Sequence, residues 1–309
     1  MSFDLLRIAD LESGELIELL DASVAAKRDP ASVRGLGEGR VVAVLFEKPS
    51  LRTRFSVEAA LARIGAHPIG AYDREVGLGQ RESLSDAARV LERYVDAIVI
   101  RTFEHSRVET IAEAAEVGVV NALSDGHHPL QALADLQTLA EERCDGDPRG
   151  LKATKLAYIG DGNNVAHSLI EACALVGSEI ALACPPAHGP DDGILAWAKA
   201  HGGTVTVHSD PASAVAGADA VYTDVWASMG QEAQAEDRRR TLEPYRVTAE
   251  LMSRARPDAI FLHCLPVHRG EEVEASVIDG PASRVFDQAE NRLHTAVAVF
   301  RRVFAQGAA

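Results

Sequence analysis

Short apolar runs alternate with helix-length amphipathic segments along nearly the whole chain. The runs are rich in Val, Ile, Leu and Ala and are almost continuously hydrophobic, which is typical of parallel strands buried on both faces. Eight strands are expected, at residues 40–46, 96–103, 117–123, 155–160, 178–184, 204–209, 219–225 and 259–265. The pattern therefore predicts an α/β protein whose parallel sheets are flanked by helices.

Two sequence signals mark the beginnings of predicted helices. Ser106 and Glu109 have the spacing of a capping box, in which each side chain accepts a hydrogen bond from a backbone N–H at the helix start. Pro129 stands where the first turn of a helix tolerates proline. We therefore expect helices to begin near these residues.

The middle of the chain carries the strongest signal of a domain boundary. Residues 142–152, ERCDGDPRGLK, combine glycine, proline and charge, as linkers often do. With 309 residues the chain is long enough for two domains. We expect domains at residues 1–141 and 142–309, each with its own parallel sheet, and a closing helix at about residues 290–306 that packs back on the first domain.

Composition narrows the class of protein. The 46 acidic residues exceed the 31 basic ones, which gives a net charge of -15 and disfavours a general nucleic-acid surface. No apolar run approaches the ~20 residues of a membrane span, and the first residues lack the pattern of a secretion signal. The four cysteines show no zinc-binding spacing and are expected to be reduced thiols. We expect a cytoplasmic protein that binds neither nucleic acid nor membranes.

The segment FEKPSLRTRFSVEAA, residues 46–60, concentrates positive charge in this acidic chain. It joins the carboxyl end of a predicted strand to the start of a predicted helix, where free backbone N–H groups and the helix dipole favour an anion. The hydroxyl and guanidinium groups suited to the several oxygens of a phosphate belong to Ser50, Arg52, Thr53 and Arg54. The alternative is a basic helix start that is merely solvated.

Polar side chains also follow two further predicted strands. Arg101 lies in the last part of the strand at residues 96–103, and His128 and Gln131 follow the strand at residues 117–123. Open α/β sheets bind ligands in the crevice beyond the carboxyl ends of their strands, so these side chains are candidates for one site. Taken alone, His128 could instead be a helix cap or a surface histidine.

The segment GDGNN, residues 160–164, lies between a predicted strand and a predicted helix. A dinucleotide-binding fingerprint would need a third glycine, but Val165 stands in that position, which disfavours a dinucleotide-dependent oxidoreductase. The side-chain amides of Asn163 and Asn164 can instead donate hydrogen bonds to the carboxylate of a ligand.

Three further segments carry charged, polar or thiol side chains at or beyond the ends of predicted strands. The loop DVWASMGQE carries Asp224, whose carboxylate would suit an ammonium group, together with Ser228 and Met229. FLHCLP places Cys264 at the end of another strand, either as a buried inert thiol or as a group that contacts a ligand. Arg292, in AENR, adds one more cation ahead of the closing helix.

Five of these motifs, SLRTR, HPLQ, DVWASMG, HCLP and AENR, occur in the order found in the aspartate/ornithine carbamoyltransferase family, which the chain resembles nearly from end to end. Each motif alone is weak, but the ordered set is highly specific. Members that use aspartate carry a different tetrapeptide in place of HCLP and lack the SMG loop. The resemblance therefore points to ornithine as the nucleophile. It implies transfer of the carbamoyl group of carbamoyl phosphate to the δ-amine of L-ornithine, which gives L-citrulline and phosphate in arginine metabolism.

The resemblance implies roles for particular residues. Those that would bind carbamoyl phosphate are Ser50, Leu51, Arg52, Thr53, Arg101, His128, Gln131, Cys264, Leu265 and Arg292. Those that would bind ornithine are Asn164, Asp224, Ser228 and Met229. The catalytic groups would be Arg101, His128, Asp224 and Cys264. No metal or organic cofactor is implied, because the leaving group of carbamoyl phosphate is already activated.

Two positions depart from the family pattern. Leu51 stands where many members have threonine, which removes a hydroxyl but keeps a backbone N–H. Gly77 stands where members present a glutamine or histidine to the active site of a neighbouring subunit, and Gln80 is a candidate substitute. The family implies a homotrimer, or a multiple of trimers, with active sites between subunits.

Other interpretations stay open. The acceptor could be a modified ornithine or a diamine such as putrescine. A diamine would leave Asn164 without a carboxylate to bind, and a modified α-amine would leave Asp224 without a cation. A third interpretation is a non-catalytic ligand-binding relative, which is disfavoured because Arg52, His128 and Cys264 are all present.

Overall fold

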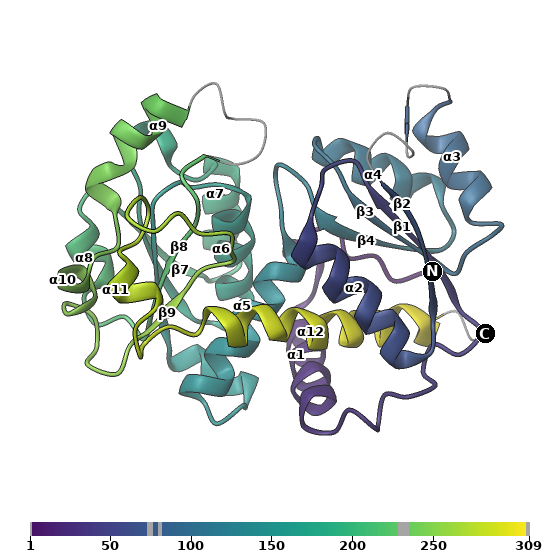
Figure 1. Ribbon diagram of the computed structural model, residues 1–309, viewed down its shortest axis with the longest axis horizontal. Helices are drawn as coiled ribbons and strands as arrows, with labels where there is room; N and C mark the ends of the chain where they lie inside the picture. The colour runs from purple at the N-terminus through teal and green to yellow at the C-terminus, as the bar shows by residue number, and fades with distance from the viewer. Residues whose placement is uncertain (1, 73–76, 80–81, 228–234, 307–309) are drawn as a thin grey trace. The chain divides into compact units, whose positions relative to one another are not determined.

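The chain forms two compact units in the computed structural model, which describes residues 2–72, 77–79, 82–227 and 235–306 (Figure 1). Unit 1 comprises Met1–Ala134 and Glu290–Ala309, and unit 2 comprises Asp135–Ala289. The chain leaves unit 1 within helix α5 (Pro129–Arg143) and returns to it within helix α12 (Val285–Gln306). The domain boundary expected after residue 141 lies near the end of α5.

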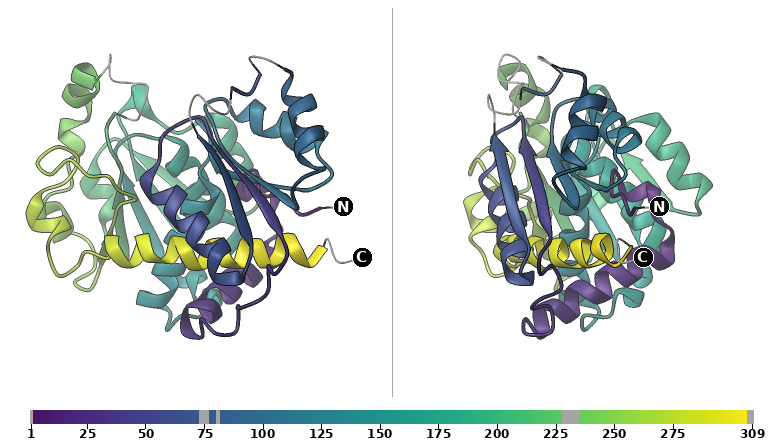
Figure 2. Two further views of the ribbon diagram at one scale, coloured as in Figure 1. Left: turned by 45° about the vertical axis from the view of Figure 1, so that its right-hand side comes forward. Right: turned by 90° about the vertical axis from the view of Figure 1, so that its right-hand side faces the viewer.

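Unit 1 is built on a parallel four-stranded sheet with the order β2-β1-β3-β4. Its strands are β1 (Val41–Phe46), β2 (His67–Tyr72), β3 (Ala97–Arg101) and β4 (Gly118–Leu123). Figure 2 shows β1 and β2 side by side, and they pair in parallel from Val41 with His67 to Phe46 with Tyr72. Strands β1, β3 and β4 are almost fully buried, as their continuous apolar runs predict.

The edge strand β2 is absent from the strands that the hydrophobic pattern predicts. Its sequence, HPIGAY, contains Pro68 and Gly70, and none of its residues is fully buried. Proline lacks the N–H needed for pairing on both sides and is tolerated at the edge of a sheet. The pattern therefore identifies the buried strands and the exposed edge strand β7 (Thr204–His208), which is rich in Thr and Val, but it misses β2.

Unit 2 is built on a parallel five-stranded sheet with the order β7-β6-β5-β8-β9. Its strands are β5 (Lys155–Ile159), β6 (Glu179–Ala183), β7 (Thr204–His208), β8 (Ala220–Thr223) and β9 (Ile260–Leu262). All eight expected strands are therefore present, and the predicted parallel α/β architecture is confirmed. The strand order reverses between β1 and β3 in unit 1 and between β5 and β8 in unit 2. Ligands of open α/β sheets bind beside such reversals.

Helices connect the strands of both units. Those of unit 1 are α1 (Ser13–Arg28), α2 (Leu51–Ile64), α3 (Leu84–Leu91) and α4 (His105–Ala114). Those lying wholly in unit 2 are α6 (Asn164–Val176), α7 (Asp192–Ala200), α8 (Pro211–Val215), α9 (Ala235–Leu242), α10 (Ala249–Met252) and α11 (Ala275–Ile278). In the described part of the chain, no helix is long and apolar enough to cross a membrane.

Both predicted helix starts lie near an observed one, but one of the two local signals is wrong. Helix α4 begins at His105, and its N-cap Glu104 makes no side-chain capping bond, so the expected capping box of Ser106 and Glu109 does not form. Ser106 already lies inside the first turn, two residues past the N-cap Glu104. The other signal is confirmed, since α5 begins at Pro129.

Candidate active site

The predicted anion-binding segment forms the start of helix α2. Ser50 is the N-cap, and its hydroxyl oxygen accepts a hydrogen bond from the Thr53 N–H at 3.3 Å. The side chain of Leu51, the first helical residue, is 68% exposed, so what Leu51 can offer a buried ligand is its backbone N–H. Such N–H groups have no partner inside the helix and favour an anion.

Arg292 and Thr53 meet although 239 residues separate them in the chain. The Arg292 guanidinium donates to the Thr53 hydroxyl at 2.6 Å, and both side chains are buried. Arg52 forms no hydrogen bond or ion pair with any other residue that the structure describes. The Arg54 guanidinium lies over the Tyr72 ring, 3.7 Å from its centroid. Arg52 and Arg292, and not Arg54, are therefore the candidates for contact with an anion.

Arg101 ends strand β3, where the strand order of the sheet reverses. Its side chain is buried, and it pairs in register with Phe46, the last residue of β1. The Arg101 carbonyl accepts a hydrogen bond from the Glu47 N–H at 2.9 Å. The end of β3 is therefore fixed beside the segment that leads from β1 to the start of α2.

His128 and Gln131 lie at the start of α5, and both side chains are buried. The Gln131 N–H donates to the His128 carbonyl at 3.0 Å. Burial lowers the pKa of His128 well below its usual value, and the positive charges of Arg292 and Arg101 lower this pKa further. The imidazole is therefore neutral at neutral pH, and the surplus positive charge around it is suited to an anion.

The protonation of His128 gives a first testable prediction. In the ligand-free protein we expect the imidazole to stay neutral at about pH 6, because its pKa is lowered from the usual value of about 6.5. Bound phosphate would offset the charges of Arg101 and Arg292, so it should raise the pKa of His128. NMR of 15N-labelled histidine, with H128Q to assign the signal, measures both effects. The prediction would be contradicted if His128 had an ordinary pKa without phosphate, or if its pKa did not change when phosphate is added.

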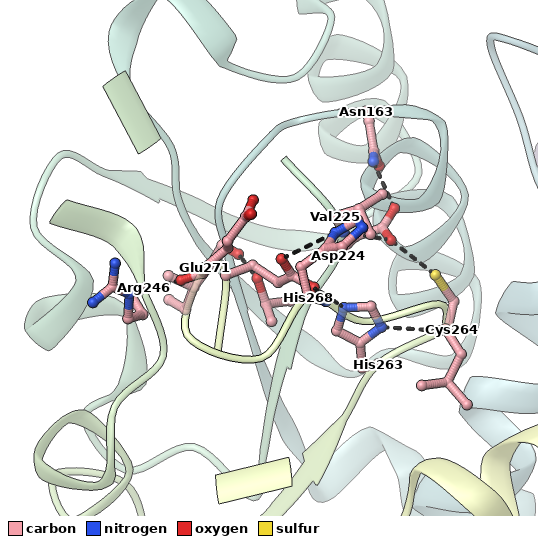
Figure 3. A network of polar contacts seen from close by, with 12 residues as sticks. Asn163, Asp224, Val225, Arg246, His263, Cys264, His268 and Glu271 are labelled. Atoms are coloured by element: carbon pink, nitrogen blue, oxygen red, sulfur yellow. Dashed lines mark hydrogen bonds and ion pairs between the residues drawn. The ribbon is translucent and has the colours of Figure 1, made fainter. Parts of the chain in front are cut away.

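Asn163 and Asp224 belong to a polar network in unit 2 (Figure 3). Asn163 caps helix α6, because its side-chain oxygen accepts hydrogen bonds from the N–H groups of Val165 and Ala166 at 2.9 and 3.2 Å. The opposite end of the same amide donates to the Asp224 carboxylate at 2.7 Å. The sequence suggested Asn163 as a donor to a ligand, whereas the structure uses it to orient Asp224.

Cys264 lies against the same carboxylate. Its thiol donates a hydrogen bond to Asp224 at 2.9 Å, as Figure 3 shows. The next residue, Leu265, has a φ of 61°, in the left-handed region that leucine rarely adopts. The Leu265 N–H donates to Nδ1 of His263 at 2.9 Å, which helps to hold this conformation. Backbone strain of this kind is concentrated at functional sites.

Gln288 holds the strand end that carries Cys264 and was missed by sequence reasoning. Its side-chain oxygen accepts a hydrogen bond from the His263 N–H at 2.9 Å, just beyond the pairing of β9 with β8. Its amide group donates to Asp135 at 2.6 Å and to the Tyr222 hydroxyl at 3.2 Å. The only signal for Gln288 in the sequence is its place directly before AENR.

Asp224 is buried and, within the described part of the chain, is hydrogen-bonded only by neutral groups. The donors are the Asn163 amide, the Val225 N–H at 2.8 Å and the Cys264 thiol. No lysine or arginine among the described residues pairs with it. Buried carboxylates usually have a cationic partner. This carboxylate is therefore suited to the ammonium group of a ligand.

The remaining predicted residues are only partly covered by the structure. Asn164 is the first residue of α6 and is partly exposed. Ser228, Met229 and Gln80 lie outside the described residues. Gly77 has a φ of 51°, a backbone conformation that favours glycine and gives a local reason for glycine at this position.

Among the residues of unit 2 that the structure describes, two groups of side chains have the composition of a metal site. Their ligand atoms lie within 4.8 Å of one another, and the groups are Asp224, His263 and Cys264, and His268, Glu271 and Glu272. In the first group, His263 Nδ1 accepts the Leu265 N–H and Nε2 lies 3.2 Å from Glu272, so both ring nitrogens are engaged. In the second group, Glu271 is paired with Arg239 at 2.9 Å. Both groups are accounted for as hydrogen-bond and ion-pair networks.

Comparison with protein-family models identifies the class of this protein. Residues 4–141 match the carbamoyl-P binding domain of aspartate/ornithine carbamoyltransferases, and residues 152–303 match their Asp/Orn binding domain. The chain belongs to the aspartate/ornithine carbamoyltransferase family, and it is a carbamoyltransferase.

Individual relatives indicate the branch of the family. An ornithine carbamoyltransferase from a Parafrankia species is 50% identical over 292 residues, covering 92% of this chain and 90% of that protein. The anabolic ornithine carbamoyltransferase of Pyrococcus furiosus is 45% identical over 306 residues, covering 97% of this chain and 96% of that protein. A solved structure of ornithine carbamoyltransferase from P. furiosus matches with a TM-score of 0.91 at 44% identity, over 97% of this chain and 96% of that one.

Proposed function

We propose that the protein transfers the carbamoyl group of carbamoyl phosphate to the δ-amine of L-ornithine and releases L-citrulline and phosphate. The naming of one relative as anabolic supports a role in arginine synthesis. The single observation that carries the choice of acceptor is Asp224, a buried carboxylate without a cationic partner among the described residues. It suits the α-ammonium group of an amino acid, as the family resemblance implies.

Carbamoyl phosphate is proposed to bind at the strand ends of unit 1. Its phosphate would lie at the start of α2, where backbone N–H groups, hydroxyls and guanidinium groups can satisfy its oxygens. Its carbamoyl group would lie near the start of α5. The residues proposed to contact it in this unit are Ser50, Leu51, Arg52, Thr53, Arg101, His128, Gln131 and Arg292.

Ornithine is proposed to bind by its amino-acid end. Asp224 would accept hydrogen bonds from the α-ammonium group, and Asn164 would donate to the α-carboxylate. Ser228 and Met229 complete the proposed set. Asn163 contributes indirectly, because its capping bonds fix the amide that orients Asp224.

The reaction needs a neutral amine and a stabilised oxyanion. The δ-nitrogen attacks the carbonyl carbon, a C–N bond forms, and the carbonyl oxygen becomes an oxyanion. The oxyanion then re-forms the C=O bond as the C–O bond to phosphate breaks, and the departing phosphate takes the proton that the nitrogen loses. Arg101 and the neutral His128 would donate hydrogen bonds to the oxyanion, usually the largest catalytic contribution. Because an alkylammonium group has a pKa of about 10, the site must favour the neutral form of the δ-amine. Asp224 and Cys264 are proposed to orient it.

Cys264 is proposed to act without forming a covalent bond to substrate. Its thiol hydrogen is engaged with Asp224, and direct attack by the amine needs no acyl intermediate. We therefore expect rapid-quench mass spectrometry to find no carbamoyl thioester on Cys264 during turnover, with C264A as the blank. Detection of such an adduct at a rate that matches turnover would contradict this prediction.

Two finer points follow from family membership. We propose a homotrimer, or a multiple of trimers, and a cytoplasmic location. In this assembly the contact usually made across subunits at the position of Gly77 would have to come from another residue, and Gln80 is the proposed substitute. Loss of apparent affinity for carbamoyl phosphate in Q80A would support that assignment. The control is Q234A, the same substitution at another glutamine.

A substrate panel tests the proposed function directly. Carbamoyl phosphate is offered with ornithine, N-acetylornithine, putrescine or aspartate, and release of phosphate and of the carbamoylated product is measured. Turnover with ornithine far above that with the other acceptors is the expected result. Preference for putrescine or acetylornithine would shift the assignment to the alternative acceptors. No turnover with any acceptor would indicate a ligand-binding relative.

A further inference from the structure

A buried ion pair in unit 2 has no role in the chemistry described above. Asp161 lies in the turn after β5, and Arg238 lies on α9. Arg238 Nη2 and the Asp161 carboxylate are 2.5 Å apart, and their side chains are only 9% and 10% exposed. Ion pairs on the surface contribute little to stability, but in a buried pair the loss of one partner leaves an uncompensated charge.

The pair connects the segment that carries Asp224 to the segment that carries its hydrogen-bond donor, Asn163. Arg238 Nε donates to the Trp226 carbonyl at 2.6 Å, and Trp226 is two residues beyond Asp224. On the other side, the Asp161 carbonyl accepts the N–H of Asn163 at 2.7 Å. Asn163 in turn donates to Asp224. A single guanidinium therefore bridges the turn that carries Asn163 and the segment that carries Asp224.

A lysine cannot reproduce this bridge. The planar guanidinium of arginine offers donors in a fixed fork, so Arg238 can meet a carboxylate and a carbonyl at the same time. The ammonium group of lysine is a single point charge on a flexible stem. The arrangement thus depends on shape as well as on charge.

We propose that Arg238 and Asp161 are positioning residues that set the relative placement of Asn163 and Asp224, and thereby the affinity for the amino-acid substrate. This inference rests on the proposed function. Neither residue is assigned to touch substrate. The pair acts by holding the backbone on both sides of Asp224, so its loss should affect ornithine binding more than the binding of carbamoyl phosphate in unit 1.

The titration of Asp161 supports this role. Burial raises the pKa of Asp161 to about 6, Arg238 opposes the rise, and the charge of Asp224 adds to it. Other titratable groups also face the pair. His188 lies 3.7 Å from Asp161, and its pKa is lowered by burial and by Arg238. The pKa values of the Cys184 thiol and the Tyr158 hydroxyl are raised by burial, and the charge of Asp161 adds to both rises. Because Asp161 gains a proton as the pH falls through about 6, the ion pair weakens on the acid side. The KM for ornithine should therefore rise more steeply between about pH 7 and 5.5 in the wild type than in D161N.

The main test compares R238Q with R239Q. Arg239 is the next residue on α9, is half exposed, and also pairs with carboxylates, so it is a matched control. We expect R238Q to raise the KM for ornithine by about tenfold or more while the KM for carbamoyl phosphate stays unchanged, since tenfold corresponds to a modest change in binding free energy. R238K should recover part of the loss, and R239Q should behave as the wild type.

A second measurement does not depend on activity. Trp226 is buried and is one of two tryptophans, so W197F leaves it as the only indole emitter. In that background R238Q should shift the Trp226 emission to longer wavelength, and R239Q should not. Unchanged emission, an unchanged KM for ornithine, or equal rises in the KM of both substrates would each overturn the positioning role. If the wild type does not carbamoylate ornithine in the substrate panel, the proposed function is wrong. The Trp226 emission still shows, independently of activity, whether Arg238 holds this segment.

Discussion

Replacing Arg101 with glutamine is expected to lower kcat/KM for carbamoyl phosphate by about 10²–10³-fold, the usual cost of losing one oxyanion donor. Arg101 is buried at the end of β3, and its charge helps to keep the pKa of His128 low. The same substitution should therefore raise the pKa of His128. Steady-state kinetics measure the first effect, and histidine NMR measures the second.

The control for this experiment is R63Q. Arg63 is also in unit 1, but it is exposed in the last turn of α2, far along the helix from the proposed phosphate site. Its replacement should leave kcat/KM unchanged. If R101Q is folded by circular dichroism and keeps wild-type kinetics, the proposed role of Arg101 in binding and catalysis is wrong.

Replacing Asp224 with asparagine is expected to lower kcat/KM for ornithine by about 10²-fold or more, because a desolvated charge partner of the substrate is lost. Asparagine has nearly the same shape and can still accept hydrogen bonds from Asn163 and Cys264. The change therefore removes mainly the negative charge. Initial-rate kinetics with each substrate varied in turn should show the loss for ornithine and an unchanged KM for carbamoyl phosphate.

The matched control is D192N. Asp192 is an exposed aspartate in the first turn of α7, also in unit 2. This variant should keep both KM values. An equal loss for both substrates in D224N would point to general damage to the fold and would contradict a specific role in binding ornithine.

Much of the architecture could be predicted because buried segments have a recognisable pattern of apolar residues. The buried strands appear as continuous apolar runs, and the helix start at Ser50 combines a capping residue with cations. Edge strand β2 lacks this pattern, since its residues are largely in contact with solvent and include Pro68 and Gly70. The other exposed edge strand, β7, was predictable because its sequence TVTVH consists largely of β-branched residues, whereas HPIGAY contains only one.

The local roles of polar residues were harder to predict. Asn163 was recognised as polar and near the site, but one amide can cap a helix, orient a carboxylate or bind a ligand, and only the geometry distinguishes these roles. The side chains of Gln288 and Arg238 contact partners at least 12 residues away in the chain, so no local motif reveals them. Arg54 appeared equivalent to Arg52 in sequence, yet the helix turns it toward Tyr72.

Unit 1 is discontinuous, because residues 290–309 follow the whole of unit 2 in the chain. That last segment contributes Arg292, which bonds to Thr53, and buried side chains such as Phe300. During synthesis, which proceeds from the N-terminus and allows early units to fold first, all of unit 2 emerges before this cation does. A nascent chain can thus complete its second sheet while the proposed phosphate site in unit 1 still lacks Arg292 and its bond to Thr53.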